Sequence, residues 1–156
     1  MEYNLVSIAE KATFVAVPRP IEGDKDYQIH WDLGANLRFP GDNHIEVILD
    51  AKVKVSEPEG HPDIAAMTLT HLFKTGDVAK YIEEGPEQAS ADFIVHMIGI
   101  SVGTLRGLMY ARTWSVLGPE VLLPVINPSI LLGQSLPRIL KNLEQSQGKS
   151  TEDISG

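Results

Sequence analysis

Three histidines each lie two residues before a carboxylate, an arrangement that could bind a divalent metal ion. The pairs are His30 with Asp32, His44 with Glu46, and His61 with Asp63. Imidazole nitrogen and carboxylate oxygen are common metal ligands. One pair supplies only two ligands, however, and the chain has no HExxH motif that would complete a set. The first two pairs instead fall on the polar side of alternating strands, so we predict solvated surface pairs and no metal site.

The other residues that could do chemistry do not form a catalytic set. His96 lies in an apolar run with one carboxylate, Asp92, at helical spacing, and the expected role is a hydrogen-bonded histidine at an interface. The 156 residues include no cysteine, which excludes a thiol nucleophile, a thiolate metal site and a disulfide. We therefore predict a protein that is not an enzyme, with no catalytic residues and no cofactor.

Glycines recur every four residues in the same apolar run, at Gly99, Gly103 and Gly107. Each glycine costs a helix about 1 kcal/mol relative to alanine, so three in one helix indicate a packing requirement. A phosphate-binding loop is the weaker interpretation, because no Gly-Lys-Ser/Thr follows. We predict that the three glycines allow another element to approach closely, as oligomer packing.

Alternating side chains predict four strands in the first half of the chain. In residues 27–39 every odd position is apolar and every even position is polar or glycine, which is typical of a strand with one buried face. The same period returns in residues 45–55 after a turn-rich tetrapeptide, which predicts a hairpin. Residues 64–73 predict a further strand paired with it, and residues 5–17 a less regular one that ends in prolines.

The second half has helical spacing. Apolar residues at steps of three and four predict a long helix over residues 91–116. Residues 122–132 are rich in large aliphatics but contain Pro124 and Pro128, which predicts an extended crossing segment. A second helix is expected from near Ser135. Four strands followed by two helices indicate an α+β fold with an antiparallel sheet, spanning residues 1–144, with a disordered acidic and polar tail at 145–156.

The composition and the apolar segments argue against a nucleic-acid-binding, secreted or membrane-inserted protein. There are 21 acidic and 13 basic residues, a net charge of -8, and the pI near 5.0 argues against nucleic-acid binding. The chain starts without the charged and apolar regions of a secretory signal. The apolar run at 93–111 contains His96 and Arg106, so a buried helix is expected rather than membrane insertion. We expect a cytoplasmic protein.

Three stretches of the sequence resemble the SecB family of export chaperones. The run His44-Ile-Glu-Val-Ile-Leu-Asp-Ala-Lys-Val-Lys-Val55 is similar to the family's third strand, and Leu72-Phe73 to the end of its fourth. The run Gly103-Thr-Leu-Arg-Gly-Leu-Met-Tyr-Ala-Arg112 is similar to its long helix. The most specific stretch, Leu122-Leu-Pro-Val-Ile-Asn-Pro128, is similar to its crossover.

This resemblance implies a fold and a function. It implies a four-stranded antiparallel sheet with two helices that assembles as a dimer of dimers, a homotetramer. It also implies an ATP-independent chaperone, a holdase, which binds unfolded polypeptides in hydrophobic grooves during protein export and translocation. By position, the residues that correspond to the client-binding groove are Trp31, Leu33, Leu123, Val125, Ile126, Leu131, Leu132 and Leu136.

The identity of the client and of the delivery partner is left open by the sequence. SecB proteins that deliver precursors to the SecA motor use an acidic sheet surface, and SecA is therefore a candidate partner. The predicted fourth strand has no acidic residue around Ala65, Ala66 and Met67. A SecB-like chaperone for another client, such as an antitoxin, is one alternative, and a small-molecule-binding α+β domain is another.

Overall fold

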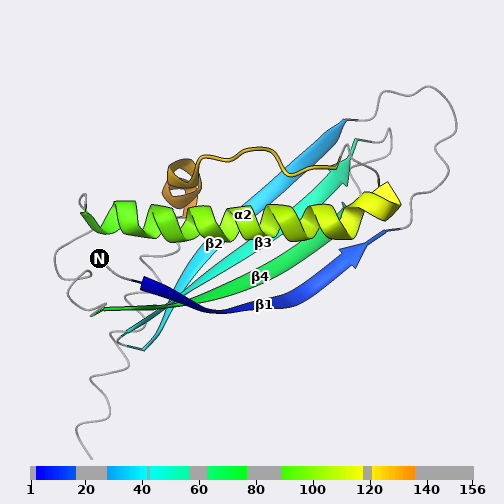
Figure 1. Ribbon diagram of the computed structural model, residues 1–156. Helices are drawn as coiled ribbons and strands as arrows, with labels where there is room; N and C mark the ends of the chain where they lie inside the picture. The colour runs from blue at the N-terminus through cyan, green and yellow to red at the C-terminus, as the bar shows by residue number, and fades with distance from the viewer. Residues whose placement is uncertain are drawn as a thin grey trace, which may run out of the picture.

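The computed structural model describes residues 3–16, 28–41, 43–56, 63–76, 89–117 and 121–135. Within these residues an antiparallel sheet is covered on one face by a long helix and by the segment that follows it (Figure 1). The strands are β1 (Tyr3–Val15), β2 (Ile29–Gly41), β3 (His44–Val55) and β4 (Asp63–Thr75), in the spatial order β1-β4-β3-β2, and the helix is α2 (Ala89–Leu117). The predicted α+β class with a four-stranded antiparallel sheet is confirmed.

The hairpin of β2 and β3 follows from the alternation in the sequence. The two strands pair without a break from Ile29 opposite Val55 to Arg38 opposite Glu46. Since the side chains of a strand alternate between faces, one apolar set packs beneath α2 and the polar set lies on the other side. We call the side away from α2 the outer face.

Strand β1 is less regular, as the sequence predicted. Its pairing with β4 shifts register between Leu5 and Ser7 and again between Glu10 and Ala12. Such bulges add an unpaired residue and bend the strand. Strand β1 is the first in the spatial order and has a neighbouring strand on one side, so it forms one edge of the described sheet. Several of its large apolar side chains are exposed, and Ile8, for example, is 44% exposed.

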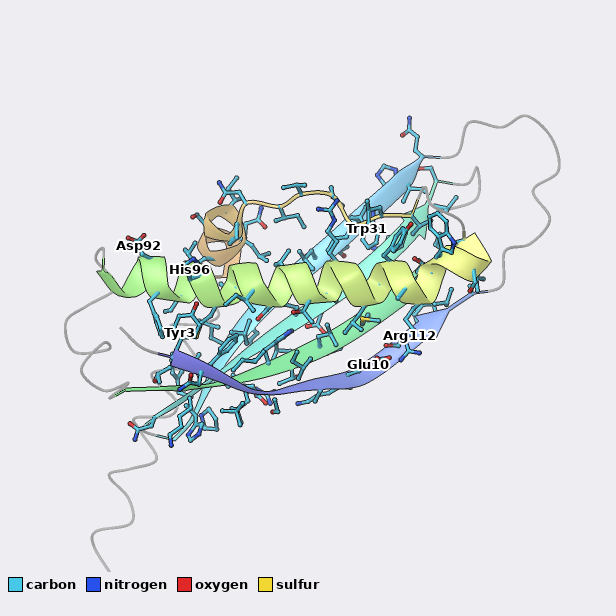
Figure 2. The ribbon with its side chains drawn as sticks, in the orientation of Figure 1. Tyr3, Glu10, Trp31, Asp92, His96 and Arg112 are labelled. Atoms are coloured by element: carbon cyan, nitrogen blue, oxygen red, sulfur yellow. The ribbon has the colours of Figure 1, made fainter. Side chains whose placement is uncertain are left out.

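Helix α2 is fixed to the sheet at both ends. Near its start, the Tyr3 ring packs edge-on against Phe93 of α2 at 5.1 Å and against Phe73 of β4 at 5.9 Å. Near its end, Arg112 donates a hydrogen bond to the Glu10 carboxylate at 3.2 Å (Figure 2). Between these contacts one side of the helix is buried in the core.

By length and composition alone, α2 could also cross a membrane. Within Asp92–Leu117 an eighteen-residue stretch is long and apolar enough to do so, and this is the one such helix in the described part of the chain. The core helix of a globular domain has the same properties. Here a third of the apolar stretch is buried, and its fully buried side chains, such as Met97 and Leu105, belong to the same core as the sheet residues.

The region after α2 differs from the sequence prediction. Residues 121–127 are extended, but residues 128–135 are already helical, so the second helix begins seven positions before the expected Ser135. The carbonyl of Asn127 accepts hydrogen bonds from the N–H groups of Ile130 and Leu131, and its side chain accepts one from the N–H of Ser129 at 3.0 Å. Asn127 is thus an N-cap and Pro128 the first helical residue. The sequence prediction treated Pro128 as a residue that interrupts a helix. Proline is also favourable at the first position of a helix, because the N–H that it lacks has no partner there. The tail at 145–156 lies outside the described residues.

Candidate functional site

Residues 121–135 carry the most exposed large aliphatic side chains of the described chain. Val125 is 84% exposed, Ile130 60% and Leu122 39%. None of these fifteen residues is charged. Figure 2 shows Trp31 of β2 beside the extended part of this region. Exposed apolar surface without charge is typical of an interaction site rather than of a catalytic one.

The predicted groove residues occupy different environments. Trp31, Leu33 and Ile126 are partly buried and pack against the core. Leu123, Leu131 and Leu132 are inside the core, with 0%, 3% and 9% of their surface exposed. Of the predicted residues that the structure describes, Val125 alone is largely exposed, and Leu136 lies outside the described residues. The groove role of this set remains a prediction, but the buried members act in this conformation as anchors for the segment.

The glycines of α2 also divide into two kinds. A Cβ atom on Gly99 would lie 3.4 Å from Cγ of Pro128, a contact distance, so this glycine faces residues 128–135 of the same chain. A Cβ atom on Gly103 or Gly107 would meet no other described element within 4 Å. These two positions share the exposed side of α2 with Ile100 and Trp114, which are 39% and 48% exposed. The predicted packing role at Gly103 and Gly107 therefore has no partner among the described residues.

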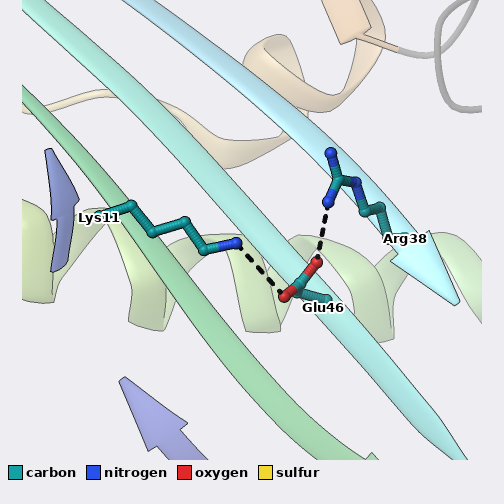
Figure 3. Close-up of polar contacts among 3 residues, drawn as sticks. All are labelled: Lys11, Arg38 and Glu46. Atoms are coloured by element: carbon teal, nitrogen blue, oxygen red, sulfur yellow. Dashed lines mark ion pairs between the residues drawn. The ribbon is translucent and has the colours of Figure 1, made fainter. Parts of the chain in front are cut away.

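Several ion pairs connect neighbouring strands on the outer face of the sheet. Glu46 on β3 lies 3.8 Å from Arg38 on β2 and 3.9 Å from Lys11, whose side chain crosses β4 (Figure 3). The described strands place four carboxylates on this face, Asp32, Glu46, Asp50 and Asp63, against five cations, Lys11, Arg38, Lys52, Lys54 and Lys74. The acidic docking surface that the resemblance implied is therefore not seen on the described part of the sheet.

In the predicted pairs of histidine and carboxylate, the residues Asp32, His30 and Glu46 contact other side chains rather than each other. Asp32 pairs with Lys54 at 3.6 Å, and Nε2 of His30 lies 2.7 Å from the Ser56 hydroxyl. Glu46 pairs with two cations, as described above. The described residues contain no group of three or more side chains that could hold a metal ion, and His61 lies outside them. His96 is exposed on α2.

One buried polar residue was not identified from the sequence. His71 on β4 is fully buried, and neither of its ring nitrogens has a hydrogen-bond partner among the described residues. Its ring stacks on that of Phe73 with 6.3 Å between the centroids. Burial lowers the pKa of His71, because the charged imidazolium loses its hydration. The signal was available, since position 71 belongs to the inward series that contains Met67, Leu69 and Phe73.

The ion pair between Glu10 and Arg112 joins β1 to the end of α2. Hydrogen bonding from Thr13, followed by that from Arg112, lowers the pKa of Glu10. The described residues thus offer an apolar surface and buried anchors, which suit binding of a polypeptide.

Comparison with known proteins identifies a similar fold. No protein-family model matches the sequence, and no curated protein matches it. Among solved structures, the chain is similar to the Rv1957 SecB-like chaperone of Mycobacterium tuberculosis, in complex with a ChAD peptide from the Rv1956 HigA1 antitoxin. The TM-score is 0.50 with 14% sequence identity, covering 80% of this chain and 90% of that one. The chain therefore has a SecB-like fold.

Proposed function

We propose that this protein is an ATP-independent holdase chaperone that binds unfolded polypeptide in the cytoplasm. The observation that carries the proposal is the uncharged region at residues 121–135, with Val125 almost fully exposed on a segment anchored by Leu123. Capture of many sequences requires apolar surface with few fixed polar partners, because a fixed polar group rejects every ligand that cannot pair with it. The absence of cysteine suits a reducing compartment.

The client class that we favour is a dedicated partner such as an antitoxin. The structurally similar chaperone was solved with a peptide from an antitoxin. Delivery to the SecA motor in protein export is less well supported, because cations balance the carboxylates on the described outer face. Charge complementarity mainly determines the rate and specificity of docking, so a balanced face gives little attraction to a basic partner.

A substitution at Val125 should separate client binding from folding. Val125→Glu places a charge on a side chain that is 84% exposed, so the fold should tolerate it, while an apolar client would have to desolvate the carboxylate. We expect the wild type to suppress aggregation of a slowly refolding protein without nucleotide, measured by light scattering. The variant should require at least about fivefold more protein for the same effect, a loss of about 1 kcal/mol in binding.

The matched control is Phe14→Glu, which introduces the same charge on a side chain of β1 that is 47% exposed and far along the chain from residues 121–135. This control should protect the refolding protein as the wild type does. Aggregation that the wild type leaves unchanged would contradict the chaperone function. Equal loss in both variants would contradict the location of the binding surface.

We also propose that the chain assembles as a homotetramer through the exposed side of α2. Gly103→Leu should reduce the mass measured by sedimentation, because no other element among the described residues lies within 4 Å of the added Cβ and the larger side chain would project toward the proposed partner. Gly103→Ala, which adds one methyl group and favours the helix by about 1 kcal/mol, is the control for propensity. A Gly103→Leu protein with the mass of the wild type would contradict this packing.

A further inference from the structure

Unpaired polar atoms lie on both sides of the contact between α2 and the sheet. Both ring nitrogens of His71 on β4 and the hydroxyl of Ser101 on α2 are buried without a hydrogen-bond partner among the described residues. Thr104 and Thr113 of the same helix instead donate to the carbonyls four residues earlier. One further unpaired hydroxyl, that of Thr70, lies on the outer face. Because buried polar groups nearly always have partners, the unpaired atoms weaken the contact between helix and sheet.

The residues around His71 are apolar. It lies on the inner face of β4, opposite Ile8 of β1 and Val47 of β3, and its ring stacks on that of Phe73. The fully buried side chains of α2 carry no charge. This burial lowers the pKa of His71, since a charged imidazolium would lose its hydration there.

The ionisable groups of the elements around His71 are paired, packed or exposed. On the inner face of the described strands they are Tyr3, whose ring packs against Phe93, and Glu10, whose carboxylate is hydrogen-bonded to Arg112. The ionisable side chains of α2 are all at least partly exposed: Asp92, His96, Arg106, Tyr110 and Arg112. The segment that follows α2 has none in its described part. Protonation of His71 therefore places a positive charge in the core without a free counter-charge among the described residues.

Backbone hydrogen bonds hold the strands together but do not hold α2. Strand β3 is paired with β2 along one edge and with β4 along the other. No backbone hydrogen bond among the described residues joins α2 to a strand, so side chains hold the helix on the sheet. Gly99, Gly103 and Gly107 also lower the helix propensity of its middle. An element held in this way opens more often than paired strands, so α2 should separate first.

We propose that His71 is an acid-sensitive switch, whose protonation releases the middle of α2 from the sheet while the strands stay paired, and which thereby uncovers apolar core side chains to a client. The part that concerns the client rests on the proposed chaperone function. Leu105 of α2 and Met67 of β4, which are fully buried, are among the side chains that the opening uncovers. Such surface has the same chemistry as the exposed aliphatics of residues 121–135.

The size of the response follows from the coupling of opening to one proton. A hydrated histidine titrates near pH 6.5, whereas the closed contact keeps the imidazole of His71 neutral. The ratio of open to closed molecules should therefore rise about tenfold between about pH 7.5 and about pH 5.5.

Native-state hydrogen exchange, corrected for the effect of pH on the intrinsic exchange rate, measures this opening. For the amides of residues 97–109 we expect the opening constant to rise about tenfold between the two pH values. At both it should exceed that of the β3 amides by at least about tenfold, because the strands open only with the whole domain. An opening constant of α2 that does not rise, or that equals that of β3, would overturn the proposal.

Substitutions identify the group that titrates. His71→Gln keeps a polar side chain in the core without a titration, so the opening constant of α2 should change by less than about twofold with pH. The matched control, His96→Gln, makes the same change at an exposed histidine of the same helix and should keep the rise of about tenfold. His71→Leu, which removes the unpaired nitrogens as well, should lack the response in a more stable protein. A full rise in either His71 variant, or its loss in His96→Gln, would exclude His71 as the switch.

Suppression of aggregation, measured by light scattering, tests the link to the client. Relative to His71→Gln, the wild type should need about threefold less protein at about pH 5.5 than at about pH 7.5, since residues 121–135 bind at both. A ratio that does not change with pH would overturn the link between opening and binding. A wild type that opens as expected but suppresses aggregation at neither pH would contradict the chaperone function and leave the structural switch standing.

Discussion

Leu123→Ala should lower the free energy of unfolding by about 2 to 5 kcal/mol, the usual cost of truncating a leucine inside a core. Leu123 has no exposed surface and packs in the core shared by the sheet and α2. Its truncation leaves a cavity, because the neighbouring side chains are held by the strands and cannot fully close it. Denaturation by urea, followed by circular dichroism, measures this loss.

The control lies two residues away on the same segment. Val125→Ala removes a side chain that is 84% exposed, so the free energy of unfolding should change by no more than about 0.5 kcal/mol. A similar loss of stability in both variants would mean that the placement of Leu123 in the core and of Val125 on the surface is wrong. An unchanged stability in both would mean that the segment does not belong to the cooperative core.

The burial of Leu123 and the exposure of Val125 could not be predicted from the sequence. Leu122, Leu123, Val125 and Ile126 are all large aliphatics, and no periodicity in a short run interrupted by Pro124 separates anchors from surface. The burial of Leu123 depends on where the segment crosses the sheet, which is a tertiary property. By contrast, the strand at 27–39 has period two over its whole length, and the structure places β2 at Ile29–Gly41.

The other differences between the sequence predictions and the structure arise where one local sequence pattern is compatible with two structures. Pro128 can break a helix or begin one, and the hydrogen bonds to Asn127 show that it begins one. The three glycines of α2 share one spacing, yet Gly99 faces Pro128 whereas Gly103 faces no other element in the described part of the chain. The charge balance of the outer face was not predicted, because cations such as Lys11 come from strands that become neighbours of Glu46 only after folding.

Acid should destabilise the protein through His71. This imidazole is fully buried with no hydrogen-bond partner among the described residues, and the residues opposite it on the neighbouring strands, Ile8 and Val47, are apolar. Burial lowers the pKa of His71 in the folded state, while an unfolded histidine titrates near 6.5. Below about pH 6.5 the unfolded state therefore binds more protons than the folded state, so stability falls as the pH falls.

The linkage relation sets the size of the effect. A difference of one bound proton changes the free energy of unfolding by at most about 1.4 kcal/mol per pH unit, and this loss continues until the folded histidine also becomes protonated. His71→Leu should remove this contribution. It should also raise stability at neutral pH, by about 1 to 3 kcal/mol, because two buried nitrogens without partners are replaced by an apolar side chain.

Urea denaturation of the wild type and of His71→Leu at about pH 7.5 and about pH 5.5 measures both effects. The wild type should lose more stability between the two conditions than the variant, and the difference isolates His71 from the other titrating groups. A variant that is less stable than the wild type at neutral pH would show that His71 has a hydrogen-bond partner. Equal acid sensitivity of the two proteins would show that the imidazole becomes protonated without leaving the core, which would require water or a carboxylate beneath α2.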